Sequence, residues 1–172
     1  MQYLIDGYNV IHHSAILKPL LDTHFEAARD ALVDKVAQFC SVSGHRARIV
    51  FDGRGQKGAS GMDLPGAPGL DVFFSADGQS ADAVIERLVY ASSSRRDTIV
   101  VTSDRGIRGL CMGLGAFTME PDNFLVDARE VQSRLFEHLD RSRREDPPQR
   151  VQDRLDDATL EHLRQLRGEL AE

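Results

Sequence analysis

The sequence predicts an α/β protein with a central parallel sheet and helices on both faces of that sheet. Short apolar runs alternate along its 172 residues with longer segments whose apolar residues recur at helical spacing. The run 98–102 is β-branched throughout, which is typical of a parallel strand buried on both faces. Right-handed crossovers then bring the carboxyl ends of the strands to one edge of the sheet.

Five short apolar runs are predicted as strands. They are residues 2–6, 46–51, 70–75, 98–102 and 116–119. Gly7 is expected to form a turn after the first strand. Residues 53–69 hold six glycines and two prolines and predict a long loop between the second and third strands.

Four segments with helical periodicity follow or separate these strands. They are residues 24–43, 80–93, 105–112 and 128–143. Thr23 and Ser80 are the expected N-caps of the first two helices, and Gly44 is the expected C-cap of the first. Two prolines at 147–148 cannot continue a helix and end the last one.

The sequence therefore predicts a domain over residues 1–146 and a C-terminal helical extension over residues 147–172. A leucine stripe on a helix at 151–170 either packs on the domain, which is the simpler reading, or binds another chain.

Composition limits the classes of function. A formal charge of −6 argues against binding nucleic acid with the whole surface, although local basic patches remain compatible with it. No apolar stretch approaches the roughly 20 residues that a membrane span needs, and the first residues lack a secretory signal. We therefore expect a cytoplasmic protein. Cys40 and Cys111 belong to no metal-ligand pattern and are expected to be buried free thiols.

Three of the predicted strands end in aspartate. Asp6, Asp52 and Asp104 follow apolar runs, and Asp82 lies in the first turn of the helix at 80–93. Carboxylates crowded at one edge repel one another unless a hard cation lies between them. The set therefore indicates a site for Mg²⁺ or Mn²⁺, which would activate water and stabilise the leaving oxygen of a phosphate ester.

Two of the four acids also have an ordinary explanation when taken alone. The helix dipole favours an acid such as Asp82 in a first turn, and Asp-Gly at Asp52 is a common turn former. The hypothesis of a metal site therefore depends on the convergence of all four acids. His12 is not expected to be a ligand, because it and His13 face different ways and lack paired ligand spacing.

Polar residues near the acids are candidates for substrate binding. Asn9 either orients a carboxylate, donates to a phosphate oxygen or caps a helix. Ser103 either steadies Asp104 or caps the next turn. Arg105 and Arg108, in the helix after the fourth strand, would either meet substrate phosphates near the acidic edge or be ordinary solvated arginines. Arg54 and Lys57 lie in the loop at 53–69, which either closes over a nucleic-acid backbone or is a plain insertion.

The ordered set of motifs resembles the YacP-like branch of the NYN family, within the PIN-like endoribonuclease group. The matching stretches are YLIDGYNVI at 3–11, IVFDG at 49–53, FSADGQSADAVIE at 74–86 and VVTSDRGI at 100–107. This resemblance implies a PIN-like three-layer α/β/α sandwich and metal-dependent cleavage of single-stranded RNA. The acidic cluster of the family corresponds to Asp6, Asp52, Asp82 and Asp104, with Asn9 as the polar companion.

We therefore expect a Mg²⁺- or Mn²⁺-dependent endoribonuclease. Asp6 and Asp104 would be the main metal ligands, Asp82 would complete the site directly or through water, and Asp52 would act directly or through a bridging group. Activated water would attack in line and leave a 3′-hydroxyl and a 5′-phosphate. Some relatives act on messenger RNA in the context of the ribosome, so both are candidate partners, whereas membrane and DNA are not expected.

Two other functions fit the sequence less well. A non-catalytic RNA- or ribosome-binding adaptor would not need an intact acidic set, which is electrostatically unfavourable without a cation. A phosphatase with an aspartyl nucleophile would need a second acid two residues after Asp6, where Tyr8 stands.

Overall fold

A computed structural model describes residues 1–53, 62–63, 67–76 and 78–145. The chain forms two compact units, Met1–Ser133 and Arg134–Glu172, and the sheet lies in the first. The strands are β1 (Gln2–Asp6), β2 (Arg46–Phe51), β3 (Met62–Asp63), β4 (Leu70–Phe74), β5 (Thr98–Val101) and β6 (Phe117–Met119). They form one sheet in the order β3-β4-β2-β1-β5-β6, in which β3 alone pairs antiparallel. The predicted α/β fold with a central parallel sheet is confirmed.

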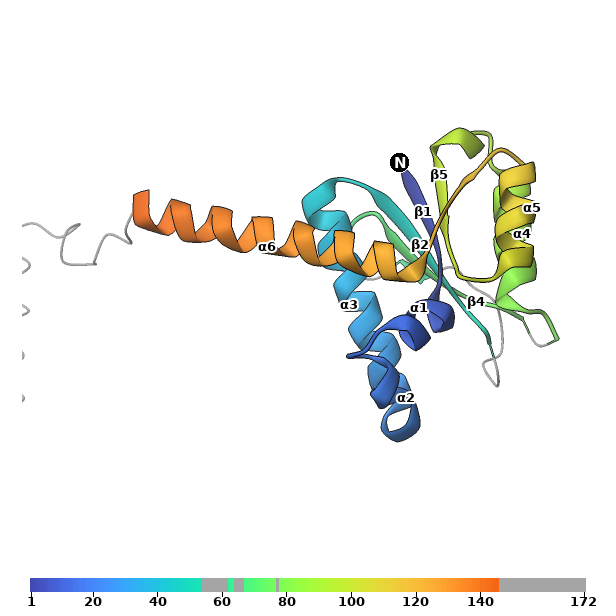
Figure 1. Ribbon diagram of the computed structural model, residues 1–172, viewed down its shortest axis with the longest axis horizontal. Coiled ribbons are helices and arrows are strands. Elements are labelled where there is room, and N and C mark those ends of the chain that lie inside the picture. The colour runs from blue at the N-terminus through green and yellow to red at the C-terminus, as the bar shows by residue number, and fades with distance from the viewer. Residues whose placement is uncertain (54–61, 64–66, 77, 146–172) are drawn as a thin grey trace, which may run out of the picture. The chain divides into compact units, whose positions relative to one another are not determined.

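Helices cover both faces of the sheet (Figure 1). They are α1 (Gly7–His13), α2 (Lys18–Thr23), α3 (Phe25–Ser43), α4 (Ala81–Ala91), the 3₁₀ turn η1 (Arg95–Asp97), α5 (Arg105–Gly113) and α6 (Pro121–Glu145). The face that carries Ile5 and Ile49 packs on α3, whereas the opposite face packs on α4 and α5. The arrangement is the expected three-layer α/β/α sandwich.

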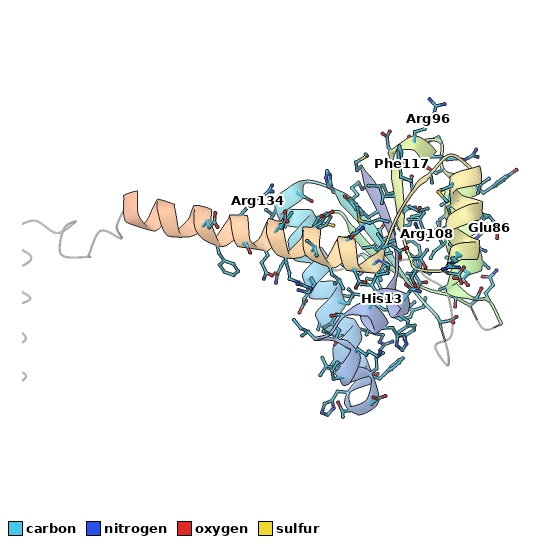
Figure 2. The ribbon with its side chains drawn as sticks, in the orientation of Figure 1. His13, Glu86, Arg96, Arg108, Phe117 and Arg134 are labelled. Atoms are coloured by element: carbon cyan, nitrogen blue, oxygen red, sulfur yellow. The ribbon has the colours of Figure 1, made fainter. Side chains whose placement is uncertain are left out.

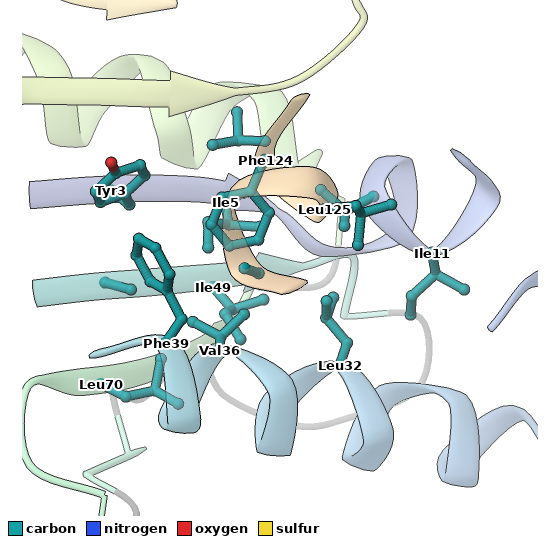
Figure 3. Close-up of a cluster of buried hydrophobic side chains, with 14 of the residues drawn as sticks. Tyr3, Ile5, Ile11, Leu32, Val36, Phe39, Ile49, Leu70, Phe124 and Leu125 are labelled. Carbon is teal, nitrogen blue, oxygen red and sulfur yellow. The ribbon is translucent and has the colours of Figure 1, made fainter. Parts of the chain in front are cut away.

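Adjacent residues of the central strands point into different cores. Ile5 and Ile49 pack with Leu32 of α3 and Phe124 of α6 (Figure 3), whereas Leu4 and Val50 pack with residues of α4 and α5. All six side chains are at most 2% exposed. Burial on both sides explains the uninterrupted apolar residues at Tyr3–Ile5 and Ile49–Phe51, since each such side chain contributes about 1.5–3 kcal/mol when buried.

The predicted element ends agree closely with the structure, with one wrong cap. Ser80 accepts a hydrogen bond from the Ala83 N–H at 3.2 Å, and Gly44 adopts φ 69° at the C-cap of α3, as expected. Thr23 is not the N-cap of α3, because it ends the separate helix α2 and His24 occupies the cap position. Pro19, at the start of α2, favours helix initiation there and explains the additional helix.

One helix of the structure is not predicted from the sequence, and another begins earlier than predicted. Gly7 does not form a simple turn but opens α1. Pro121 starts α6 in the first helical turn, where its missing N–H is tolerated, so the helix expected at 128–143 begins seven residues sooner. Within the expected loop at 53–69, β3 is described. The boundary at 146/147 and the helix at 151–170 lie outside the described residues.

No described helix is both long and apolar enough to span a bilayer.

Candidate active site

The four predicted acids meet at the carboxyl edge of the sheet. Asp6, Asp52 and Asp104 follow the neighbouring strands β1, β2 and β5, and Asp82 lies in the first turn of α4. Burial raises the pKa of Asp82, and the charges of Asp104 and Asp52 raise it further. The acids therefore lie within electrostatic range of one another, as their positions in the sequence predict.

Asp6 is the most buried of the four acids, with 8% of its surface exposed. One carboxylate oxygen accepts a hydrogen bond from the Asn9 N–H at 3.2 Å, which caps α1, and the other accepts from the Thr102 hydroxyl at 3.3 Å. Burial raises the pKa of Asp6 to about 6, and repulsion from Asp82 and Asp52 adds to this effect, although the two hydrogen bonds oppose it. An adjacent cation would relieve this unfavourable ionisation.

Asn9 connects helix α1 to the loop after β5 at the edge of the sheet. Its side-chain oxygen accepts hydrogen bonds from the Ser103 N–H at 2.9 Å and from the Ser103 hydroxyl at 3.0 Å. These bonds fix the amide and leave its NH₂ group as the donor. The helix-capping alternative for Asn9 is wrong, because Asp6 holds the cap position and Asn9 lies within α1.

Asp52 is held by Ser75, a residue that the sequence does not single out. The Ser75 hydroxyl donates to the Asp52 carboxylate at 3.1 Å and accepts from the Gly53 N–H at 2.9 Å, and Ser75 is fully buried. The only available signal is its position as the first polar residue after β4. Together Ser75 and Gly53 fix the direction in which Asp52 leaves β2.

The glycines after Asp6 and Asp52 are required by close contacts. A Cβ atom on Gly53 would lie 1.8 Å from the Ser75 carbonyl oxygen, and one on Gly7 would lie 2.3 Å from the Phe51 ring. Each Asp-Gly pair therefore delivers a carboxylate at a point where the backbone packs too tightly for any side chain.

Asp104 is exposed and caps α5. Its carboxylate accepts from the Ile107 N–H at 2.9 Å, and its own N–H donates to the Thr102 hydroxyl at 3.2 Å. Thr102 thereby connects Asp6 to the backbone of Asp104. The side chains of Asp82 and Asp104 retain partial or full exposure, so they can receive an ion from solvent.

The predicted basic residues differ in their surroundings. Arg105 is exposed beside Asp104, whereas Arg108 is partly buried and forms an ion pair with Glu120 (Figure 2). The predicted substrate contact of Arg108 would have to compete with Glu120. Ser103 is occupied in holding Asn9. Arg54 and Lys57 lie outside the described residues.

The donor set fits a hard divalent cation. All four acids offer oxygen, and the two cysteines are buried in α3 and α5, away from the edge. Among the residues that the structure describes, no group of three or more acids, histidines or cysteines is placed so that it could hold a metal ion. Mg²⁺ ordinarily takes one or two carboxylates and fills its shell with water and phosphate, so the expected ion would not need three protein ligands at once.

Comparisons with known proteins agree with the geometry. The sequence profile of the YacP-like NYN domain matches residues 3–168. YacP of Bacillus subtilis (strain 168) is 30% identical over 149 residues, which cover 86% of each chain. The crystal structure of Rae1 (YacP) from Bacillus subtilis has a TM-score of 0.73 at 28% identity, covering 97% of this chain and 94% of that one. The crystal structure of a point mutant of the same Bacillus subtilis protein has a TM-score of 0.72 at 27% identity, covering 85% and 86%.

The profile match spans nearly the whole chain, and the similar structures share its PIN-like α/β arrangement. NYN and PIN-like nucleases generally use divalent metals. The chain therefore belongs to the YacP-like NYN domain family, which implies a nuclease or RNA-related function.

Proposed function

We propose that this protein is a Mg²⁺- or Mn²⁺-dependent endoribonuclease that cleaves single-stranded RNA. The observation that supports it best is the convergence of four carboxylates, one of them buried with its pKa raised to about 6, at the carboxyl edge of a parallel sheet. α/β sheets bind their ligands at this edge. The choice of RNA rests on the family and not on the geometry.

The residues at this edge would have different roles in hydrolysis. Asp6 and Asp104 would hold the ion, with Asp82 completing the site directly or through water. When bound, the ion supplies activation of water and stabilisation of charge on the phosphate. Asp52, fixed by Ser75, would support the ion or the attacking water from the β2 side.

Asn9 would orient the scissile phosphate. Its side-chain oxygen is fixed by Ser103, so its NH₂ group could donate to a phosphate oxygen without rearrangement. Arg105 would neutralise the neighbouring backbone, and Arg108 would do so on release from Glu120. Cleavage would leave a 3′-hydroxyl and a 5′-phosphate. Messenger RNA on the ribosome is the substrate that the family resemblance favours.

The test is cleavage of a single-stranded RNA by the full chain, with Mn²⁺ or with EDTA. Asp104→Asn should lower kcat at least about 100-fold, because the charge is lost while asparagine keeps the cap on α5. Asp97→Asn is the matched control, since Asp97 is exposed in η1 at the opposite end of β5. Equal cleavage by both variants, or cleavage in EDTA, would exclude the mechanism.

The same assay distinguishes the rival function. A non-catalytic RNA- or ribosome-binding adaptor would bind RNA without metal, would not cleave it, and would bind equally well after Asp104→Asn. A nuclease would lose cleavage in that variant.

A further inference from the structure

A second cluster of side chains lies at the same end of the sheet as the acids. It consists of Tyr8, Phe25, Arg29 and Phe74, here called the aromatic platform. Tyr8 follows Asp6 by two residues, and Phe74 directly precedes Ser75, which holds Asp52. Phe25 is the first residue of α3, whose other end leads into the start of β2. The platform is therefore continuous with the edge that carries the carboxylates.

The platform packs three aromatic rings around one guanidinium and leaves Phe25 partly exposed. The Arg29 guanidinium lies between two rings, 5.6 Å from the centre of Phe25 and 5.5 Å from that of Phe74. Tyr8 packs on Phe25 with ring centres 5.2 Å apart and an interplanar angle of 31°. Phe25 is nevertheless 48% exposed. A large aromatic ring held in place by two neighbours keeps a surface that another flat group could cover.

Arg29 is not satisfied by its surroundings. Its side chain is 13% exposed, and its Nε is buried without a hydrogen-bond partner among the described residues. Its ion pair is with Glu26 at 3.6 Å, and that glutamate is 82% exposed. Because Nε is buried, a phosphate would reach Arg29 through its terminal amino groups, and a phosphate oxygen satisfies these better than a long contact with a solvated carboxylate.

We propose that the aromatic platform is a nucleobase subsite, in which a base of single-stranded RNA stacks on Phe25 and the adjoining phosphate contacts Arg29. This inference rests on the proposed function, because it places a nucleotide beside the bond to be cleaved. Stacking on an aromatic ring requires an unpaired base and tolerates any of the four, so the subsite selects single strands without reading sequence.

A packing role alone is the competing explanation, since Phe25 also connects α3 to α1 through Tyr8. Two substitutions separate the explanations. Phe25→Leu keeps an apolar side chain but removes the ring, whereas Phe25→Trp keeps a ring. Tyr90→Leu is the matched control, because Tyr90 is 67% exposed and has the Arg95 guanidinium 5.5 Å from its ring, at the far end of α4.

The experiment measures kcat and KM for a short single-stranded RNA in Mn²⁺, together with the melting temperature of each variant. Stacking on an aromatic ring changes affinity on the order of tenfold per base. Phe25→Leu should therefore raise KM about tenfold with kcat nearly unchanged, whereas Phe25→Trp and Tyr90→Leu should resemble the wild type. For an RNA with abasic nucleotides throughout, the KM of the wild type should be higher than for the normal RNA. The KM of Phe25→Leu for the abasic RNA should equal that of the wild type.

Three results would overturn the inference. If Phe25→Leu cleaves with the KM of the wild type, no base stacks there, and the proposed nuclease function still stands. If Phe25→Leu and Phe25→Trp lose melting temperature and activity alike, the platform serves packing only. If the wild type cleaves no single-stranded RNA in Mn²⁺, the nuclease proposal fails and the subsite fails with it.

Discussion

The two ends of the parallel sheet differ: the amino end has a surface hollow, whereas the carboxyl end has the clustered carboxylates of the proposed site. At the amino end, a hollow of about 620 Å³ is lined by residues 92–97, Leu114 and Gly115. Its polar groups are satisfied locally, since Arg95 donates to the backbone carbonyls of Val89 at 3.2 Å and Tyr90 at 2.5 Å. Arg96, labelled in Figure 2, lies at this end in η1.

The carboxyl end gathers carboxylates that are unfavourable to ionise together. There, burial raises the pKa of Asp6 and Asp82, repulsion from neighbouring carboxylates raises both further, and Arg29 Nε has no partner among the described residues. Unfavourable charge and unsatisfied donors indicate a missing ligand, whereas volume does not. We therefore expect the carboxyl end, where the proposed site lies, to be the less stable one, and this difference can be measured.

The largest expected effect on stability is a gain from Asp6→Asn. The pKa of Asp6 is raised from 3.8 to about 6, mainly by burial, so the folded protein holds this proton more tightly than the unfolded chain. The protonated Asp6 carboxyl therefore adds to the free energy of unfolding. This stabilisation is fully present below pH 3.8 and is lost as the pH rises through 6. Asparagine keeps the cap without the charge, so the free energy of unfolding should rise by about 3 kcal/mol at pH 8.

Urea unfolding in EDTA checks this prediction. The gain should shrink to about 1 kcal/mol at pH 4.5, because the wild-type carboxyl is then largely protonated when folded. Asp97→Asn, at the amino end, should show no gain at either pH, and its cleavage activity should persist where that of Asp6→Asn is lost. A variant Asp6→Asn that is less stable than the wild type at pH 8 would contradict the account of this end of the sheet.

The second effect is a loss of stability from Gly53→Ala. Its Cβ would lie 1.8 Å from the Ser75 carbonyl oxygen, so β2 and β4 must separate locally, at a cost of about 2–3 kcal/mol. Gly109→Ala is the control, since nothing lies within 4 Å of its Cβ and an alanine within α5 should stabilise by about 0.5–1 kcal/mol. Thermal unfolding of both variants measures the difference, and a neutral Gly53→Ala would refute the close contact.

The third effect is stabilisation by metal at the carboxyl end alone. Binding to the folded state at 100 times the dissociation constant adds about 2.7 kcal/mol, which corresponds to a rise of several degrees in Tm. Mn²⁺ should therefore raise the Tm of the wild type and of Asp97→Asn but not that of Asp104→Asn. An equal rise in all three proteins would place the metal elsewhere.

The sequence predicts the sheet well because its signals are local. A continuous β-branched run defines β5, the apolar residues Ile49–Phe51 mark the end of β2, and parallel topology then requires Asp6, Asp52 and Asp104 to share an edge. The roles of these acids stay a prediction, although their proximity is established.

Long-range partners could not be read from the sequence. The Asn9–Ser103 bonds join residues 94 positions apart, and Ser75 reaches Asp52 across 23. The aromatic platform likewise joins α1, α3 and β4, and no local pattern at Phe25 or Arg29 indicates its partners. Helix α1 escapes prediction because it has only seven residues and opens with glycine, a poor helix former.

The smallest expected effect comes from Ser75→Ala, which leaves the buried Gly53 N–H without its acceptor and frees Asp52. The loss of stability should be about 1–2 kcal/mol, because water cannot replace the hydroxyl at a fully buried position. Ser92→Ala, at the amino end, removes an analogous bond to the Ser94 N–H at 3.2 Å, but solvent takes its place and the change in stability should stay within about 0.5 kcal/mol.

A cleavage assay separates the effect of Ser75→Ala on stability from its effect on function. If Asp52 supports the ion from its fixed position, Ser75→Ala should lower kcat about tenfold at a temperature where the variant is fully folded. Unchanged kcat would remove Asp52 from the mechanism while leaving Asp6, Asp82 and Asp104 in place.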